Sequence, residues 1–145
     1  MKIHRLFPAR AGVLLLALAL ASAQTAYQPK FQGDPARSDS EAAALGYLRT
    51  FLRAQKTYKK KNDHYATSLL DLVSTGTFTR RMAATDRGDY TVKFTPHKEK
   101  DTFEMVMIPK QQDRVRRSFF SDQEGKIRAD EQRVADSSSP ILKAD

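Results

Sequence analysis

The stretch Ser38–Lys61, SDSEAAALGYLRTFLRAQKTYKKK, decides the fold because it predicts one long amphipathic helix. Apolar or nearly apolar residues recur along it at steps of four and three: Ala44, Leu48, Phe51, Gln55 and Tyr58. Such a stripe is typical of a helix that buries one face against a flat surface. Ser38 and Glu41 form a capping box at its start, and Asn62 is the expected left-handed stop at its end.

Residues 1–23 predict a secretory signal peptide. Residues 1–10 carry basic side chains and no acid, residues 11–20 are an apolar run, and Ala21-Ser22-Ala23 fits an A-x-A cleavage site. Cleavage there leaves Gln24 as the mature start and no stable membrane span. We therefore expect an exported protein, periplasmic or extracellular.

Length and composition limit the rest of the chain to one domain. The 145 residues include no cysteine, so an exported domain must be stabilised by its core without disulfides. Loss of the three basic residues of the signal peptide lowers the net charge from +8 to +5. This moderately basic balance is compatible with nucleic acid, anionic lipid or acidic glycan as a partner, and requires none of them.

The pattern divides the mature chain into a flexible lead-in at 24–37, a folded domain at 38–142 and a short tail at 143–145. From Asp89 on, apolar residues recur at every second position, a spacing that predicts strands. We expect four of them: Tyr90–Phe94, Phe103–Met107, Val115–Ser121 and Lys126–Arg128. The predicted fold class is α+β, with a long N-terminal helix packed on an antiparallel sheet of about four strands.

The predicted core joins this helix to the sheet. Leu48 and Phe51 should face apolar strand residues, namely Tyr90, Val92, Phe103 and Phe119. Between helix and sheet, Ser68 and Asp71 repeat the capping pattern before a helix of little more than one turn that Gly76 closes. A loop from Thr77 to Gly88 should follow.

Four segments of the chain resemble bacterial type IV pilin-like and type II secretion pseudopilin-like proteins: AQKTYKKKNDHYATSLLDL (54–72), GDYTVKF (88–94), RRSFFSDQEGKIR (116–128) and SSSPIL (137–142). The resemblance covers about residues 40–142. It implies a long helix against a four-stranded antiparallel sheet, as in the globular heads of pilins, and it implies no catalytic chemistry.

The N-terminus departs from that family. A prepilin has a short basic leader ending in Gly, then an apolar half-helix with an acid at its fifth position. Here Gly12 is followed by Val13, and the fifth position is Ala17. The resemblance therefore implies a pilin-like head with an ordinary secretory signal, and we expect a monomer or small oligomer that forms no filament.

One helix face carries the candidate binding residues, spaced at steps of four, three and four: Arg49, Arg53, Lys56 and Lys60. With Arg114, Arg116 and Arg117 expected nearby, this basic stripe has the charge needed to bind phosphates or acidic glycans. The simpler interpretation is a solvated helix face opposite the core.

Other candidate chemistry is weak. Asp122 and Glu124 are too few for a calcium site and suit a tight turn with Gly125. His64 and His97 lie in separate loops and lack the paired spacing of a zinc site. Ser118 and Ser121 lack a nucleophile-elbow motif. We expect no catalytic residue, metal or cofactor, and hence no enzyme.

The sequence thus predicts a secreted or periplasmic pilin-like module that acts by protein–protein interaction with an unknown partner, at the cell envelope or in a secretion system. The alternative is a protein that binds nucleic acid or another anionic polymer through the basic helix face.

Overall fold

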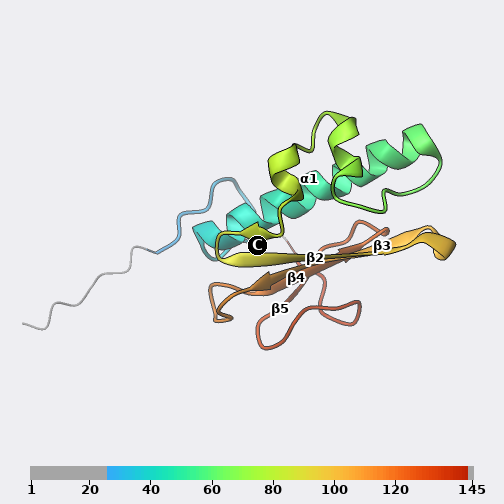
Figure 1. The fold of residues 1–145 in the computed structure, drawn as a ribbon. Helices are drawn as coiled ribbons and strands as arrows, with labels where there is room; N and C mark the ends of the chain where they lie inside the picture. The colour runs from blue at the N-terminus through green and yellow to red at the C-terminus, as the bar shows by residue number, and fades with distance from the viewer. Residues whose placement is uncertain (1–25, 144–145) are drawn as a thin grey trace, which may run out of the picture.

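The computed structural model describes residues 26–143, so the predicted signal peptide and its cleavage site lie outside the described residues. Within that range the elements are α1 (Asp39–Asn62), η1 (Asp71–Thr75), η2 (Arg80–Ala83), β1 (Asp86–Arg87), β2 (Tyr90–His97), η3 (Lys98–Lys100), β3 (Thr102–Pro109), β4 (Ser118–Asp122) and β5 (Arg128–Asp130). The three η elements are short 3-10 helices. Figure 1 shows α1 on one face of the sheet and the loop directly after β5 on the other.

The predicted long helix is α1, and the Ser38 half of its predicted capping box is confirmed, whereas the Glu41 side chain accepts the Arg37 amide instead of the Ser38 amide. Ser38 has an extended backbone, and its hydroxyl oxygen accepts the amide of Glu41 at 3.1 Å. The predicted stop at Asn62 is wrong by one residue. Asp63 takes the left-handed conformation, with φ of 63°, while the Asn62 side chain donates to the Tyr58 carbonyl and stays in the helix. Aspartate is one of the few residues that tolerate this conformation.

The five strands form one antiparallel sheet in the order β1-β2-β3-β4-β5. The predicted architecture of a long N-terminal helix on about four strands, as in a pilin head, is therefore wrong, although one helix with an antiparallel sheet is an α+β arrangement. The additional strand is β1, in which Asp86 pairs with Thr91 and Arg87 with Tyr90. Periodicity misses it because two residues are too few to alternate. Gly88, with φ of 67°, makes the turn into β2.

Two strands begin later than predicted. β4 begins at Ser118 instead of Val115, because the Asp113 carboxylate accepts the Val115 amide at 3.0 Å and holds a local turn there. β5 begins at Arg128 instead of Lys126. The carbonyl of Ile127 accepts the amide of Leu142, so it is not part of the pairing with β4.

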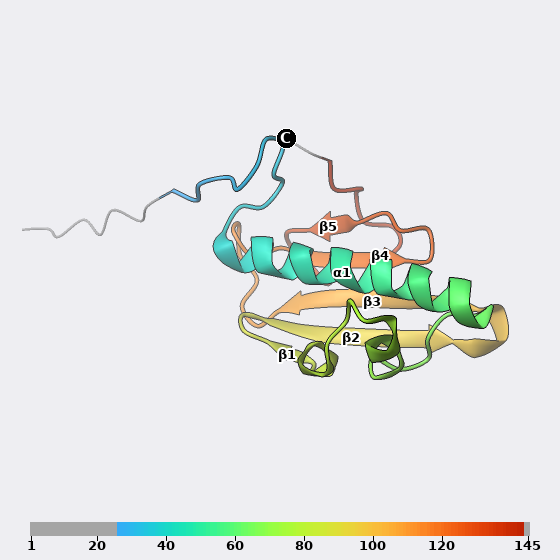
Figure 2. The same ribbon diagram turned by 90° about the horizontal axis from the view of Figure 1, so that it is seen from above.

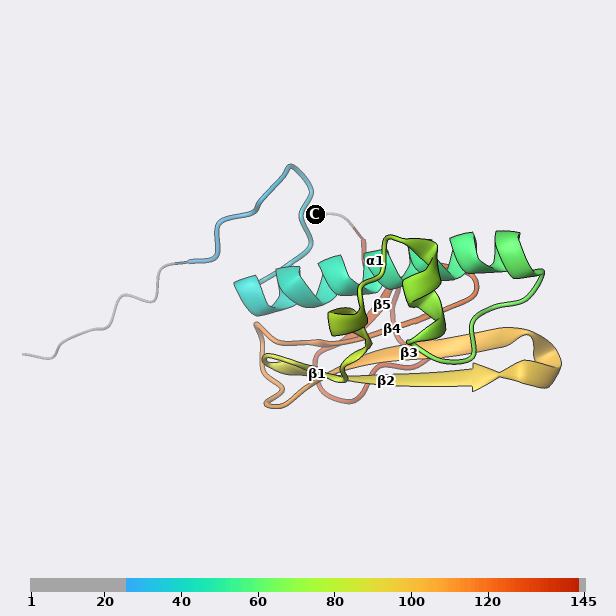
Figure 3. The same ribbon diagram turned by 45° about the horizontal axis from the view of Figure 1, so that its top comes forward.

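The predicted core is confirmed. Leu48 and Phe51 are fully buried, in one cluster with the predicted strand residues Tyr90, Val92, Phe103 and Phe119. Phe51 and Phe103 meet edge to face, with ring centres 5.4 Å apart. Figure 2 shows α1 over β3 and β4, and the chain between α1 and β1 over β2; Figure 3 shows α1 running along the sheet.

The second face of the sheet carries a smaller apolar cluster of Val106, Phe120 and Ala135. Ala135 comes from the segment after β5, and its amide donates to Ser118 Oγ at 2.9 Å. The backbone of residues 140–142 bonds along the edge of β5, where the Ala129 amide donates to the Pro140 carbonyl at 3.0 Å. Both faces of the sheet are therefore covered in part by chain.

A buried ion pair joins the start of α1 to the start of β4. The side chains of Glu41 and Arg117 are 0% and 8% exposed, with Arg117 Nη2 at 2.7 Å from Glu41 Oε2. Glu41 also accepts the Arg37 amide at 2.8 Å, and Arg117 donates to the Pro35 carbonyl at 2.6 Å. The sequence predicts Glu41 as a capping residue and Arg117 as a surface residue, so neither half of this pair was predicted.

Asp34 secures the chain before α1. This residue is 6% exposed, and its carboxylate accepts the Tyr27 hydroxyl at 2.6 Å and the amides of Lys30 and Ala36 at 3.1 Å. The Tyr27 hydrogen bond, followed by the two amides, lowers the pKa of Asp34. The same bond raises the pKa of Tyr27 to about 12.

Candidate binding surface

The four predicted anion-binding residues form one row on α1, and we call them the basic stripe: Arg49, Arg53, Lys56 and Lys60. Arg53, Lys56 and Lys60 are exposed, whereas Arg49 is half-buried with its guanidinium 5.9 Å from the centre of the Phe31 ring. Among residues 26–143, no acidic side chain lies within ion-pair distance of any of the four. Their charge is therefore available to a ligand.

The arginines expected near the stripe do not extend it. Arg117 is buried against Glu41, and Arg116 pairs with Asp113. The Ser38 hydroxyl donates to the Val115 carbonyl, which places this segment beside the N-terminal end of α1. The stripe instead runs toward the other end of the helix.

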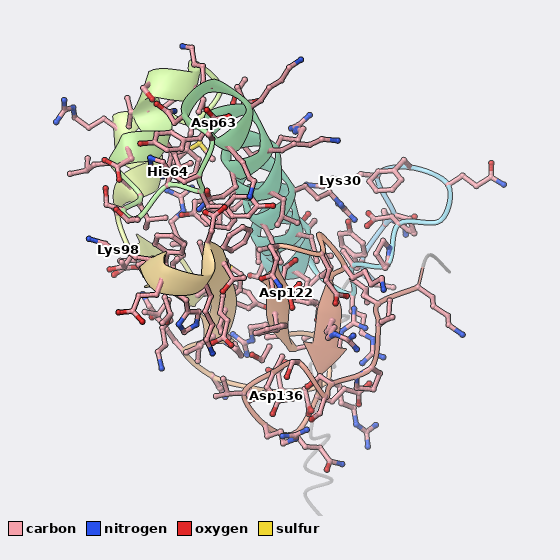
Figure 4. The ribbon with its side chains drawn as sticks, turned by 90° about the vertical axis from the view of Figure 1, so that its right-hand side faces the viewer. Lys30, Asp63, His64, Lys98, Asp122 and Asp136 are labelled. Atoms are coloured by element: carbon pink, nitrogen blue, oxygen red, sulfur yellow. The ribbon has the colours of Figure 1, made fainter. Side chains whose placement is uncertain are left out.

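A cleft of about 380 Å³ separates α1 from the turn between β4 and β5, and we call it the hairpin cleft. Arg53 and Lys56 line its helix side, and Asp122 and Glu124 line its turn side. The rest of the lining consists of the half-buried Leu52 and Tyr65, the buried Gln55 and Phe103, and Gln123 and Gly125 of the turn. Figure 4 looks onto this end of the molecule, where Asp122 lies at the end of β4 below the helix. The cleft therefore has walls of opposite charge.

The acidic wall is held by a tight turn, as predicted. The Asp122 carboxylate accepts the Glu124 amide at 2.9 Å, and the Asp122 carbonyl accepts the Gly125 amide at 2.9 Å. Gly125 has φ of 75°, which glycine adopts without strain. Glu124 pairs with Lys126 at 3.3 Å, and no ion pair within the described range crosses the cleft. The two walls are therefore open to a ligand between them.

Tyr65, in the lining of the cleft, is held by an ion pair between Lys59 and Asp101. Asp101 accepts the Tyr65 amide at 2.8 Å, and Lys59 Nζ lies 4.4 Å from the centre of the Tyr65 ring. The hydrogen bond between Lys59 and Asp101 raises the pKa of the lysine and lowers that of the aspartate. Both groups are therefore charged at neutral pH. Asp101 neutralises the charge of Lys59, whereas the four residues of the basic stripe have no acidic partner among the described residues.

The two histidines and the serine considered as candidate site residues make contacts within the fold. His64 and His97, from different segments, line one shallow cleft of about 260 Å³ with Asp101. The part of the chain that the structure describes contains no group of three or more metal-ligating side chains placed to hold an ion. Ser118 Oγ donates to the Met107 carbonyl at 3.1 Å, so this buried hydroxyl serves the sheet.

The acidic wall is the part of the site that the sequence could not reveal. Asp122 and Glu124 lie far along the chain from Arg53, and only the sheet topology brings them together.

Between residues 26 and 143, no helix is both long and apolar enough to cross a bilayer. No protein-family model, curated protein or solved structure matches this chain.

Proposed function

We propose that this chain is an exported, non-enzymatic module that acts by protein–protein contact at the cell envelope, with the hairpin cleft as its binding surface. The observation that carries the proposal is the mixed lining of the cleft: cations on α1 and acids on the opposite turn, with the half-buried side chains of Leu52 and Tyr65 in the same lining. A protein segment can complement both charges and the apolar lining at once. A uniformly charged polymer would be attracted by one wall and repelled by the other.

Two sequence features support the cellular setting. The three-part pattern of residues 1–23 supports export, and the resemblance of residues 40–142 to pilin-like and pseudopilin-like proteins supports a partner in the envelope or in a secretion system. Mass spectrometry of the exported protein tests the first feature. We expect a mature start at Gln24, whereas a start at Val13 would indicate pilin-type processing.

Site-specific crosslinking in cells tests the surface. A photo-crosslinking residue in place of the exposed Gln123, within the acidic turn, should give one discrete protein adduct, and Lys56→Glu should abolish it. The matched control is the same crosslinker at exposed Thr91, whose side chain faces the other side of the sheet from Val92. The proposed surface would be refuted by equal adduct yields from both positions, or by an adduct that Lys56→Glu leaves unchanged.

Anionic-polymer binding is the second candidate, because the basic stripe has no acidic partner in the described residues. On this alternative, heparin or DNA binds weakly and is released by moderate salt. Reversing all four stripe residues, Arg49, Arg53, Lys56 and Lys60, to glutamate abolishes the binding.

The pair of changes Asp122→Asn and Glu124→Gln separates the two candidates. Neutral side chains on the turn remove repulsion from a polyanion, so polymer binding should strengthen. Binding of a protein segment that complements both walls should weaken. Tighter heparin binding together with an unchanged protein adduct would therefore favour the polymer.

A further inference from the structure

A second cleft lies between α1, η2 and β1, and none of its lining residues belongs to the hairpin cleft. We call it the η2 cleft. Its volume is about 430 Å³, within the range of small-molecule sites. Its apolar lining includes the exposed Ala43 and the half-buried Met82, together with the buried Ala44 and Met107. An apolar body of a few carbon atoms therefore suits the interior.

Arg87 is the best-placed polar group in this cleft. Its guanidinium lies 4.7 Å from the centre of the Tyr47 ring, and its Nη1 donates to the Arg81 carbonyl at 3.3 Å. Tyr47 is itself held, because its hydroxyl donates to the Met82 carbonyl at 3.0 Å and its ring meets Phe78 edge to face. The guanidinium is thus held in place before any ligand arrives, which lowers the entropy cost of binding.

The charge of the η2 cleft is positive. Arg81 and Arg87 both line it, and neither has an ion-pair partner among residues 26–143. The acid in the lining, Asp86, is compensated by Lys110, whose Nζ lies 2.8 Å from Asp86 Oδ1. The two guanidinium groups therefore leave an excess of planar, forked hydrogen-bond donors, which match a carboxylate.

We propose that the η2 cleft binds a small carboxylate, with the carboxylate group on Arg87 and Arg81 and an apolar body against Ala43 and Met82. This site goes beyond the protein contact proposed for the hairpin cleft and does not depend on it. A free carboxylic acid and the C-terminal residue of a peptide share the recognised chemistry. The two sources are distinguished by the probes below.

An NMR titration of the purified exported protein with N-acetyl-leucine tests the proposal. Amide signals of Ala43, Tyr47 and Arg87 should shift, with a Kd on the order of 1 mM for so small a ligand. N-acetyl-leucinamide has the same body without the charge and should bind about tenfold more weakly. A short peptide ending in leucine that binds more tightly than N-acetyl-leucine identifies a peptide terminus, and equal binding identifies a free acid.

Matched arginine variants complete the test. Arg87→Gln should weaken N-acetyl-leucine binding about tenfold, and Arg81→Gln should weaken it measurably. Arg80→Gln is the control, because Arg80 is the exposed neighbour of Arg81 and does not line the cleft. Should Arg87→Gln fail to fold, Arg81→Gln decides, since the Arg81 side chain is exposed. Four results would each overturn the proposal. They are equal binding of the acid and the amide, equal losses of binding in all three variants, the same amide shifts with inorganic phosphate alone, and no amide shifts at all.

Discussion

The carboxylate of Glu41 accepts hydrogen bonds from Arg117 and from the amide of Arg37, with no exposed side-chain surface. Glu41→Gln would leave the Arg117 guanidinium buried without a counter-charge, so we expect a loss of about 3–5 kcal/mol in unfolding free energy. Urea unfolding measures it. Asp39→Asn is the control, because the Asp39 side chain is 88% exposed and its pair with Lys30 should contribute at most about 1 kcal/mol. Equal losses in both variants would contradict the role of the buried pair.

Two helix residues on opposite faces of α1 should respond very differently to truncation. Leu48 is fully buried, and Leu48→Ala should cost about 2–5 kcal/mol through lost burial and a residual cavity. Arg53 is exposed and bonds only to Thr50 among its described neighbours, so Arg53→Ala should change stability by no more than about 0.5 kcal/mol. Chemical denaturation of both variants checks this. Equal, small effects would show that the helix face has been assigned wrongly.

At the scale of elements, Asp34 holds the segment before α1, and its contribution should depend on pH. Its hydrogen bonds lower the pKa below the ordinary value of about 3.9, so the ionised form stabilises the fold above about pH 4. That contribution is lost as the pH falls through the lowered pKa. We expect Asp34→Asn to reduce unfolding free energy at neutral pH, and the difference from the unsubstituted protein to shrink in acid.

Urea unfolding across a pH series provides the measurement. Tyr27→Phe removes the principal hydrogen bond to Asp34, so it should act in the same direction and bring the pKa of Asp34 nearer to its ordinary value. A stability difference for Asp34→Asn that stays constant down to about pH 2 would contradict this account.

The segment after β5 should be needed to protect the second face of the sheet. Ala135→Asp places a charge against Val106 and Phe120, where an unpaired ion costs several kcal/mol, roughly 3 or more. Ser137→Asp adds the same charge two residues away at an exposed position and should have little effect. Thermal unfolding and binding of a hydrophobic dye would compare them. Similar behaviour of the two variants would mean that this segment does not shield the face.

The elements that could be predicted from sequence are those whose signals are local and long. α1 has many turns of apolar periodicity and a capping serine, and Leu48 and Phe51 follow from that pattern. β1 could not be predicted because it has two residues, and the start of β4 was misplaced because Asp113 forms a local turn. The basic stripe is visible along one helix, whereas its acidic counterpart depends on long-range pairing of strands.

At the scale of the whole molecule, the covered helix face argues against self-association through α1. The apolar side of α1 is buried on the sheet, and its outer side carries the basic stripe, which repels the same stripe on a second copy. We expect a monomer or small oligomer in analytical ultracentrifugation of the purified protein. Ordered fibres in electron microscopy would contradict this.

The buried ion pair also bears on which alignment β4 adopts beside its neighbours. Phe119 and Phe120 are adjacent and both buried, one on each face of the sheet, so β4 lacks the alternation that normally penalises a one-residue slip. Such a slip would exchange two phenylalanines at small hydrophobic cost. It would also draw Arg117 away from Glu41 and leave both charges buried and unpaired. Replacing the pair with Glu41→Leu and Arg117→Met removes that penalty, so it should give two sets of NMR amide signals in β4, one for each alignment. The variant should also be less stable, because the amides of Arg37 and Arg117 lose the carboxylate that accepts them.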